Sequence, residues 1–295
     1  MRWDRSRASD NVEDRRGDAF SNGAGGGMRL GGRSIGLGTI VIALVAMLLG
    51  VDPSVVFNLA GGLGGPPTHQ QSQQTAPAPP AEDAAARFVS HVLGDTEDTW
   101  RSIFAKSGKT YEDPKLVLFS GSTQTACGLG QSASGPFYCP GDHKVYIDLD
   151  FFKDLGSRFG APGDFAQAYV IGHEVGHHVQ NLLGISDQVQ TERQRSNEKR
   201  ANQLSVKLEL QADCFAGVWA NHADRTRQVL EAGDIDEGLN AATAIGDDRL
   251  QKQSSGHVVP DSFTHGSSAQ RVRWFKRGIE SGDPAVCNTF KSAQL

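Results

Sequence analysis

The chain has 295 residues, of which 38% are hydrophobic and 21% are charged, values typical of a folded protein with some polar segments. Its net charge is −5, and the last two-thirds of the sequence contain no long run of Lys or Arg. Because nucleic-acid phosphates require a concentrated basic surface, this pattern argues against a nucleic-acid partner.

The first 34 residues mix Arg and acidic residues with Gly and Ser, and they show neither helical nor strand periodicity. A segment of this composition buries too little apolar surface to offset the entropy that ordering costs. We therefore expect residues 1–34 to form a disordered tail.

Residues 35–51 form an uncharged run, IGLGTIVIALVAMLLGV. A membrane-spanning helix needs about 20 such residues, with a range of roughly 17–25. A buried core helix is the alternative, but the polar segments on either side offer nothing to bury it against. The run therefore predicts a single transmembrane anchor.

The charges around this run predict its orientation. Several Arg residues precede it, whereas no Lys or Arg occurs between Ser34 and Arg87. The positive-inside rule then places the N-terminus in the cytoplasm and the larger C-terminal part outside it, as in a single-pass protein of the cell membrane. A cleaved signal peptide is the alternative, although its basic region would be unusually long and no clear cleavage site follows the run.

Residues 52–81 are expected to link the anchor to a folded domain at residues 82–295. The linker includes the stretch GGLGGPPTHQQSQQTAPAPPA, whose Gly, Pro and Gln residues are typical of a flexible to semi-extended tether.

All four cysteines follow the apolar run, on the side predicted to be oxidising. An even number there suggests two disulfides, with three possible pairings. Cys127 and Cys139 flank a Gly/Ser/Pro-rich loop, so we pair them by proximity and assign Cys214 to Cys287.

The domain has the pattern of a helix-rich α+β fold with a small sheet. Periodicity and boundary residues predict strands at residues 115–120 and 144–148, and helices at residues 84–93, 97–105, 151–159, 163–183, 198–221, 234–251 and 271–279. The strand at Tyr146, Ile147 and Asp148 is also a candidate cleft edge for an extended peptide, an ordinary sheet strand being the alternative.

A metal site is predicted at His173 and His177. These residues are four apart on an expected helix, so both imidazoles project from one face and can bind one zinc ion. Glu174 lies about 100° around the helix, the general-base position of the H-E-x-x-H motif. The alternative is a surface helix with two solvated histidines, which the apolar flanks AYVIG and VQNLLG disfavour.

The third ligand must come from elsewhere in the sequence, because catalytic zinc usually takes three protein ligands and a water. The extended motif H-E-x-x-H-x-x-G-x-x-H is excluded by Gln180 and Leu183. The segment ELQAD supplies Glu209 as a candidate ligand and Asp213, four residues later, as an acceptor for the imidazole of His173. A solvated helix face is the alternative for this pair.

Five segments occur in a fixed order along the chain: HEVGHHVQ, ELQADCFAGVWA, AIGDDRLQ, PDSFTHGSSAQRVRWF and CNTF. Together they resemble the bacterial putative neutral zinc metallopeptidase family over residues 82–292. The resemblance implies a gluzincin-type peptidase with one zinc ion per chain. Its ligands would be His173, His177 and Glu209, its base Glu174, and its architecture a single membrane anchor.

The stretch THGSSAQR is also similar to a segment of membrane gluzincins of the CAAX-prenyl-protease type. That resemblance implies that His265 or Arg271 binds substrate or stabilises the oxyanion of the tetrahedral intermediate. The alternatives are that His265 caps a helix and that Arg271 pairs with an acidic residue of the domain.

The function predicted from these residues is that of a membrane-anchored zinc endopeptidase. It would hydrolyse peptide or protein substrates through a zinc-activated water, with Glu174 as the general base. Two alternatives stay open: an inactive extracytoplasmic binding domain that zinc stabilises, and a zinc amidase that acts on cell-wall peptides.

Overall fold

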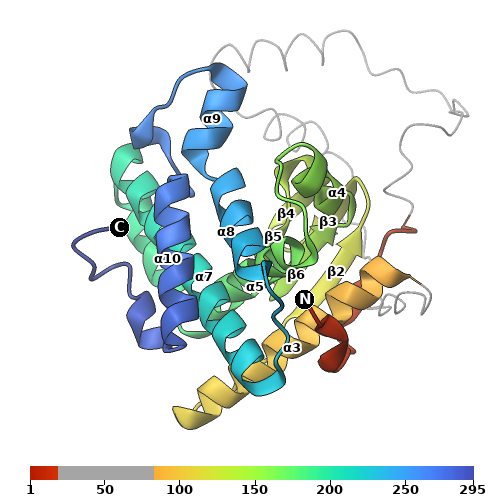
Figure 1. Cartoon of the computed structure of the whole chain (residues 1–295). Helices are drawn as coiled ribbons and strands as arrows, with labels where there is room; N and C mark the ends of the chain where they lie inside the picture. Colours follow the sequence, from red (N-terminus) through yellow and green to blue (C-terminus); the bar gives the residue numbers. More distant parts are fainter. Residues whose placement is uncertain (19–82) are drawn as a thin grey trace, which may run out of the picture. The chain divides into compact units, whose positions relative to one another are not determined.

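The computed structural model describes residues 1–18 and 83–295, whose arrangement is shown in Figure 1. The predicted anchor at residues 35–51 and the linker at residues 52–81 lie outside these ranges. Among the helices that the structure describes, none combines the length and the apolar character needed to cross a bilayer.

The described residues form a helix-rich α+β fold with a small mixed sheet, as the sequence predicts. The helices are α3 (Ala84–Lys106), α4 (Asp150–Ser157), α5 (Asp164–Leu182), α6 (Ile185–Gln194), α7 (Glu198–Arg227), α8 (Asp234–Ala244), α9 (Asp247–Ser255) and α10 (Ser268–Ser281). Within the described ranges, four short 3-10 helices accompany them: η1 (Trp3–Arg5), η3 (Ser132–Ser134), η4 (Pro260–Ser262) and η5 (Pro284–Cys287).

The main sheet has the strand order β1-β2-β6-β5. Strands β1 (Val12–Asp14), β2 (Lys115–Phe119) and β6 (Lys144–Asp148) are parallel, and β5 (Phe137–Cys139) runs antiparallel to β6. Strands β3 (Ser122–Thr125) and β4 (Gly128–Gln131) form a separate hairpin. Because β6 is paired on both sides, the prediction that it forms the cleft edge is wrong, and β5 is the edge strand beside it.

The predicted disorder of residues 1–34 does not hold for residues 1–18. This segment contributes η1 and β1 and packs against α3, where Figure 1 shows it in red. Two of its arginines form ion pairs with α3 and the residue before it: Arg7 pairs with Glu97, and Arg16 pairs with Asp83. Composition does not reveal these ion pairs, because the acidic partners lie far away in the sequence.

Several predicted helix boundaries also change. One continuous helix, α3, replaces the two expected at residues 84–93 and 97–105, because Asp95 and Thr96 between them are buried and hydrogen-bonded rather than exposed in a turn. The helix expected at residues 234–251 is divided into α8 and α9 at Ile245 and Gly246. Helix α7 continues to Arg227, and α6 was not predicted.

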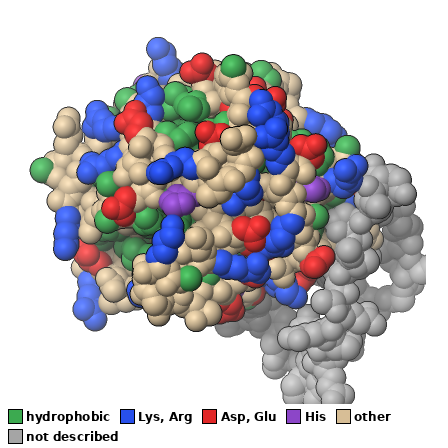
Figure 2. Space-filling model, turned by 60° about the horizontal axis from the view of Figure 1, so that its bottom comes forward, with side chains coloured by type: hydrophobic (Ala, Val, Ile, Leu, Met, Phe, Trp, Pro, Cys, Tyr) green, Lys and Arg blue, Asp and Glu red, His purple; other side chains and the backbone are tan. Residues whose placement is uncertain are grey.

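The core lies between the sheet, α3 and the helices α5, α7, α8 and α10. Large aromatic side chains fill it: the rings of Phe165 and Trp219 stack, and Phe275 meets Tyr169 edge to face. On the face that Figure 2 shows, basic, acidic and apolar side chains are interspersed.

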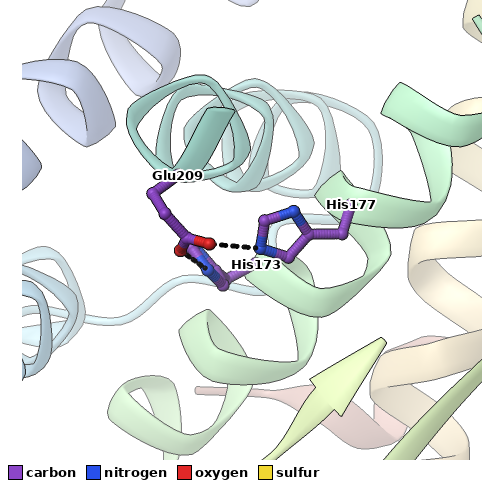
Figure 3. A group of neighbouring side chains, drawn as sticks. All are labelled: His173, His177 and Glu209. Carbon is purple, nitrogen blue, oxygen red and sulfur yellow. Dashed lines mark hydrogen bonds and ion pairs between the residues drawn. The ribbon is translucent and has the colours of Figure 1, made fainter. Parts of the chain in front are cut away.

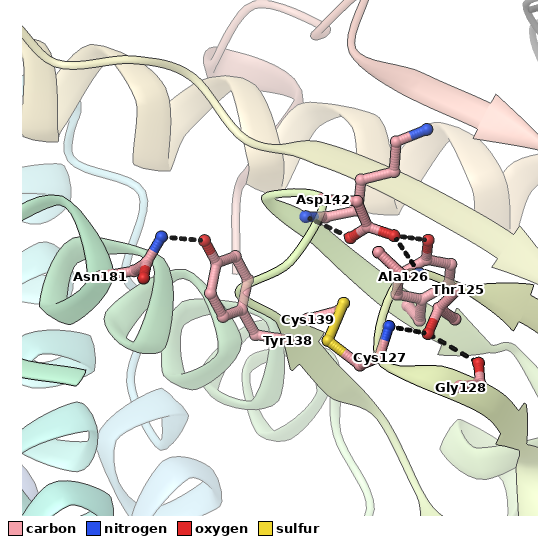
Figure 4. Close-up of a disulfide and its surroundings, with 10 residues drawn as sticks. Thr125, Ala126, Cys127, Gly128, Tyr138, Cys139, Asp142 and Asn181 are labelled. Carbon is pink, nitrogen blue, oxygen red and sulfur yellow. Dashed lines mark hydrogen bonds between the residues drawn. A yellow bond between two sulfur atoms is a disulfide. The ribbon is translucent and has the colours of Figure 1, made fainter. Parts of the chain in front are cut away.

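Both disulfides have the pairing expected from the sequence. Cys127, between β3 and β4, is bonded to Cys139 at the end of β5, which ties the hairpin to the sheet edge (Figure 4). Cys214 of α7 is bonded to Cys287 of η5.

Candidate metal centre

Helices α5 and α7 lie unusually close together at Gly176. A Cβ at this position would be 2.9 Å from the carbonyl oxygen of Ala212, so a larger residue would push the helices apart. The glycine therefore allows side chains of α5 and α7 to meet beside it.

Three side chains converge from these two helices, as Figure 3 shows: His173 and His177 from α5, and Glu209 from α7. Their ligand atoms all lie within 4.8 Å of one another. The Nε2 atom of His173 is 3.1 Å from Oε2 of Glu209, and the Nε2 atom of His177 is 3.4 Å from Oε1 of Glu209.

This geometry fits a zinc ion. Donor atoms at 2.0–2.1 Å from a tetrahedral zinc ion lie about 3.3 Å from one another, close to the separations between the imidazoles and Glu209. Two imidazoles and one carboxylate are also a known ligand set of catalytic zinc sites, in which a fourth position stays open.

The imidazole of His173 is oriented from behind by Asp213. Its Nδ1 atom is 2.8 Å from Oδ1 of Asp213, which leaves Nε2 directed at Glu209. Asp213 is fully buried and is also bonded by Tyr169, at 2.5 Å, and by two nitrogens of Arg271, each at 2.8 Å. These three partners satisfy both oxygens of the carboxylate.

Arg271 therefore makes the contacts expected from the alternative interpretation, in which it pairs with an acidic residue of the domain. Its side chain is 3% exposed, and its remaining nitrogen lies 3.4 Å from the carbonyl oxygen of Ile245. The oxyanion role predicted for Arg271 stays a prediction, but the guanidinium is already committed to Asp213.

Gln180 orients the second imidazole. Its Oε1 atom accepts a hydrogen bond from Nδ1 of His177 at 2.9 Å, and its Nε2 atom donates to the carbonyl oxygen of Leu208 and to Gln211. The residue that excludes the extended motif in the sequence thus fixes the ring of His177 in the structure.

The charges of this centre are strongly coupled. Burial alone would lower the pKa of His177, but the carboxylates of Glu209 and Glu174 outweigh it and raise the pKa to about 9. Burial would raise the pKa of Glu209, but the two imidazoles hold it well below its usual value. Such a site favours positive charge between its side chains, which is what a bound cation supplies.

Glu174 lies beside the three candidate ligands without being part of their group. Its side chain is buried, and it lines the same cavity as His173 and His177. Burial raises the pKa of Glu174, which makes its carboxylate a stronger base than an exposed glutamate.

His265 faces the cavity from the other side and is held by Asp247. Its Nδ1 atom is 3.2 Å from Oδ1 of Asp247, whereas Oδ2 of Asp247 accepts the backbone N–H groups of Thr264, His265 and Gly266. The side chain of His265 is 52% exposed, and its hydrogen bond with Asp247 raises its pKa. His265 is therefore a fixed hydrogen-bond donor with free access to the cavity.

The cavity has a volume of about 690 Å³, and its lining contains the three candidate metal ligands, Glu174, His265 and Arg271. Much of the remaining wall is apolar or aromatic: Phe137, Tyr138, Phe151, Phe159, Val170 and Leu250. A volume of this size is typical of ligand-binding clefts.

The edge strand β5 is fixed to α5 by Tyr138. Its hydroxyl lies 3.0 Å from Nδ1 of His178 and 3.2 Å from the amide nitrogen of Asn181, both on α5, and Figure 4 shows the bond with Asn181. His178 is fully buried and also contacts the carbonyl oxygen of Glu112, so it packs rather than ligates.

Sequence reasoning missed four contributors to this site: Tyr169, Gln180, Asp247 and the link through Tyr138. Tyr169 lies four residues before His173 and Gln180 three residues after His177, so helical spacing could have indicated both. Asp247 falls within the quoted segment AIGDDRLQ, but nothing local connects it with His265.

The sequence matches the family described as putative neutral zinc metallopeptidase over residues 1–290. It is 57% identical to the YpfJ protein of Escherichia coli K12 over 291 residues, which cover 98% of this chain and 99% of that protein. It is 41% identical to Mycobacterium tuberculosis Rv2575 over 265 residues, 85% of this chain and 86% of that protein. No solved structure is significantly similar. With the two-helix centre in place, these matches establish that the chain belongs to the putative neutral zinc metallopeptidase family.

Proposed function

We propose that the protein is a zinc-dependent endopeptidase that binds one zinc ion per chain through His173, His177 and Glu209. The observation that carries this proposal is the position of Glu174, a buried carboxylate that lines the cavity beside the three ligands without being one of them. A purely structural zinc site fills its fourth position and needs no adjacent base.

In the proposed reaction, zinc, when bound, lowers the pKa of a water molecule and polarises the scissile carbonyl group. Glu174 accepts the proton of the attacking water and returns it to the leaving amine. His265, held by Asp247, donates a hydrogen bond to the oxyanion that develops on the substrate. Asp213 and Gln180 keep the two imidazoles in the ligating orientation.

The position of strand β5 is a second argument for a peptide as the substrate. Among the described strands it pairs only with β6, so its outer edge can accept main-chain hydrogen bonds from an extended peptide. Phe137 and Tyr138 of this strand line the cavity, and Tyr138 links the strand to α5. A peptide bound along β5 would therefore be held close to the metal-binding helix.

The test is Glu174→Gln, measured by metal analysis and by mass spectrometry of a digested peptide library. We expect about one zinc ion per chain in both proteins and a loss of cleavage of about 10²–10⁴-fold in the variant, the range that general-base catalysis supplies. Glu198→Gln, the same change at the exposed start of α7, serves as the control and should cleave like wild type.

Cleavage by Glu174→Gln at the wild-type rate would refute the assignment of the base. A wild-type protein that holds zinc but cleaves nothing would instead be the zinc-stabilised binding domain. Release of products from cell-wall peptides alone would identify the amidase.

A further inference from the structure

The N-terminal segment, residues 1–18, occupies a site on α3 that is shaped for it. Its backbone crosses α3 at Gly94, where an added Cβ would lie 2.3 Å from the carbonyl oxygen of Arg7 and 3.2 Å from the nitrogen of Ser9. Glycine inside a helix is less stable than alanine, so a glycine at this point is explained by the chain that passes over it.

The charge pattern of α3 also matches this segment. The side chain of Glu97 is completely buried, and its described partners are Arg7, the hydroxyl of Ser9 at 2.6 Å and the amide of Asn11 at 2.8 Å. All three belong to the N-terminal segment. Without it, the acceptors of Glu97 would lose these partners, and an unpaired buried carboxylate is strongly unfavourable.

The sheet also binds the N-terminal segment, through strand pairing and ion pairs. Strand β1 pairs in parallel with β2, with Val12 opposite Leu116, and the backbone N–H of Leu116 donates to the carbonyl oxygen of Asn11 at 2.9 Å. Glu13 is buried and contacts the ammonium groups of Lys144 at 3.0 Å and Lys115 at 3.2 Å. Helix α3 and the sheet thus both hold this segment.

This packing has a consequence for membrane topology. The segment and the rest of the fold are separated in the sequence by the uncharged run at residues 35–51, and one crossing of a bilayer within that run would place β1 and β2 on opposite sides. We propose that residues 1–18 and residues 83–295 lie on the same side of any membrane that the chain contacts, and that this is the oxidising side.

The two disulfides support the choice of side, because such bonds persist in oxidising compartments. The arginines from which the opposite orientation was predicted lie in the sequence before the uncharged run, and several of them belong to this packed segment. In the fold, Arg7, Arg15 and Arg16 are paired with Glu97, Glu13 and Asp14, so these arginines take part in the packing of the segment.

The first test uses the full chain in bacterial cells with one added cysteine, either Ala8→Cys in the N-terminal segment or Ala105→Cys in α3. Both alanines are exposed, and the four native cysteines are all in disulfides. A maleimide that cannot cross the inner membrane should label both variants equally in intact cells whose outer layers admit the reagent.

Labelling of Ala105→Cys with protection of Ala8→Cys, until the inner membrane is opened, would overturn the same-side topology. Protection of both until that point would retain the shared side and overturn its assignment as the oxidising one.

The second test measures whether the segment is docked, using thermal unfolding of the purified full chain. Gly94→Ala should lower the melting temperature, because its new methyl group collides with the backbone of Arg7. Gly156→Ala in α4 is the matched control, since its Cβ would make an ordinary contact of 3.7 Å with Pro162, and it should leave the melting temperature unchanged or raise it. If the segment were elsewhere, Gly94→Ala would raise the melting temperature through its better helix propensity.

Discussion

Glu209 and Glu97 are both carboxylates on long helices, and both are removed from most solvent, but their counter-charges differ. Glu97 is completely buried and pairs with a guanidinium that is always charged. Glu209 is 17% exposed and faces two imidazoles, whose charge depends on protonation. The first carboxylate is therefore satisfied within the fold, whereas the second leaves a position that a metal cation can fill. Burial of an acidic residue alone does not identify a metal site; the chemistry of its partners does.

The largest expected effect follows from removing a metal ligand. Glu209→Gln keeps the side-chain shape but takes away the anionic donor, so we expect loss of stoichiometric zinc and of peptide hydrolysis. Metal analysis after dialysis and the peptide-library digest measure these effects. Glu97→Gln should keep both zinc and activity; if it lost zinc as Glu209→Gln does, the distinction between the two carboxylates would fail.

The next largest effect, a loss of activity without loss of zinc, is expected at His265 and Asp247 on the other side of the cavity. His265→Gln should lower kcat/KM by about 10²–10³-fold with zinc still bound, because a donor to the oxyanion is lost. Asp247→Asn should act in the same direction by releasing His265. Asp248→Asn is its neighbouring control, since Asp248 bonds Ser268 rather than His265. Full activity in His265→Gln would leave this histidine without a catalytic role.

A smaller loss of zinc affinity is expected when the residue that orients a ligand, rather than the ligand itself, is changed. Asp213→Asn should weaken zinc binding by about 10–100-fold, the usual effect of losing the carboxylate that orients a ligating imidazole. It should also destabilise the fold, because Arg271 loses its charged partner. Tyr169→Phe removes only a hydroxyl from the same carboxylate and should have a weaker effect. Competition with a chelator measures the affinity, and unchanged binding in Asp213→Asn would contradict the orienting role.

More of the candidate metal centre than of the surrounding fold could be predicted from the sequence. His173 with His177 and Glu209 with Asp213 are each four residues apart, so helical periodicity places each pair on one face. No comparable signal joins Asp247 to His265, because a helix and a loop separate them. Strand β1 was missed for the same reason: its partners on β2 follow about a hundred residues later, and its own sequence is mostly charged.

The pH dependence of stability gives a test that does not depend on catalysis. Burial lowers the pKa of His178 to about 4, whereas an unfolded histidine titrates near 6.5. Protonation therefore favours unfolding, so this contribution is fully present above about pH 6.5 and is lost as the pH falls towards 4. The shift corresponds to about 3 kcal/mol. In metal-free protein, the stability difference between wild type and His178→Gln should shrink over this range; a constant difference would contradict a buried neutral imidazole.

The smallest effects distinguish two acidic residues that share one arginine. Arg7 contacts both Glu97, whose side chain is fully buried, and Asp98, whose side chain is 35% exposed. Glu97→Gln should lower the free energy of unfolding by about 1–3 kcal/mol, because the loss of charge weakens the three hydrogen bonds that this buried carboxylate accepts from the N-terminal segment. Asp98→Asn should change it by less than about 1 kcal/mol, since water screens an exposed pair. Denaturant unfolding of the full chain measures both. Equal effects on the free energy of unfolding would mean that solvent reaches Glu97. That outcome would contradict the docking of the N-terminal segment on α3.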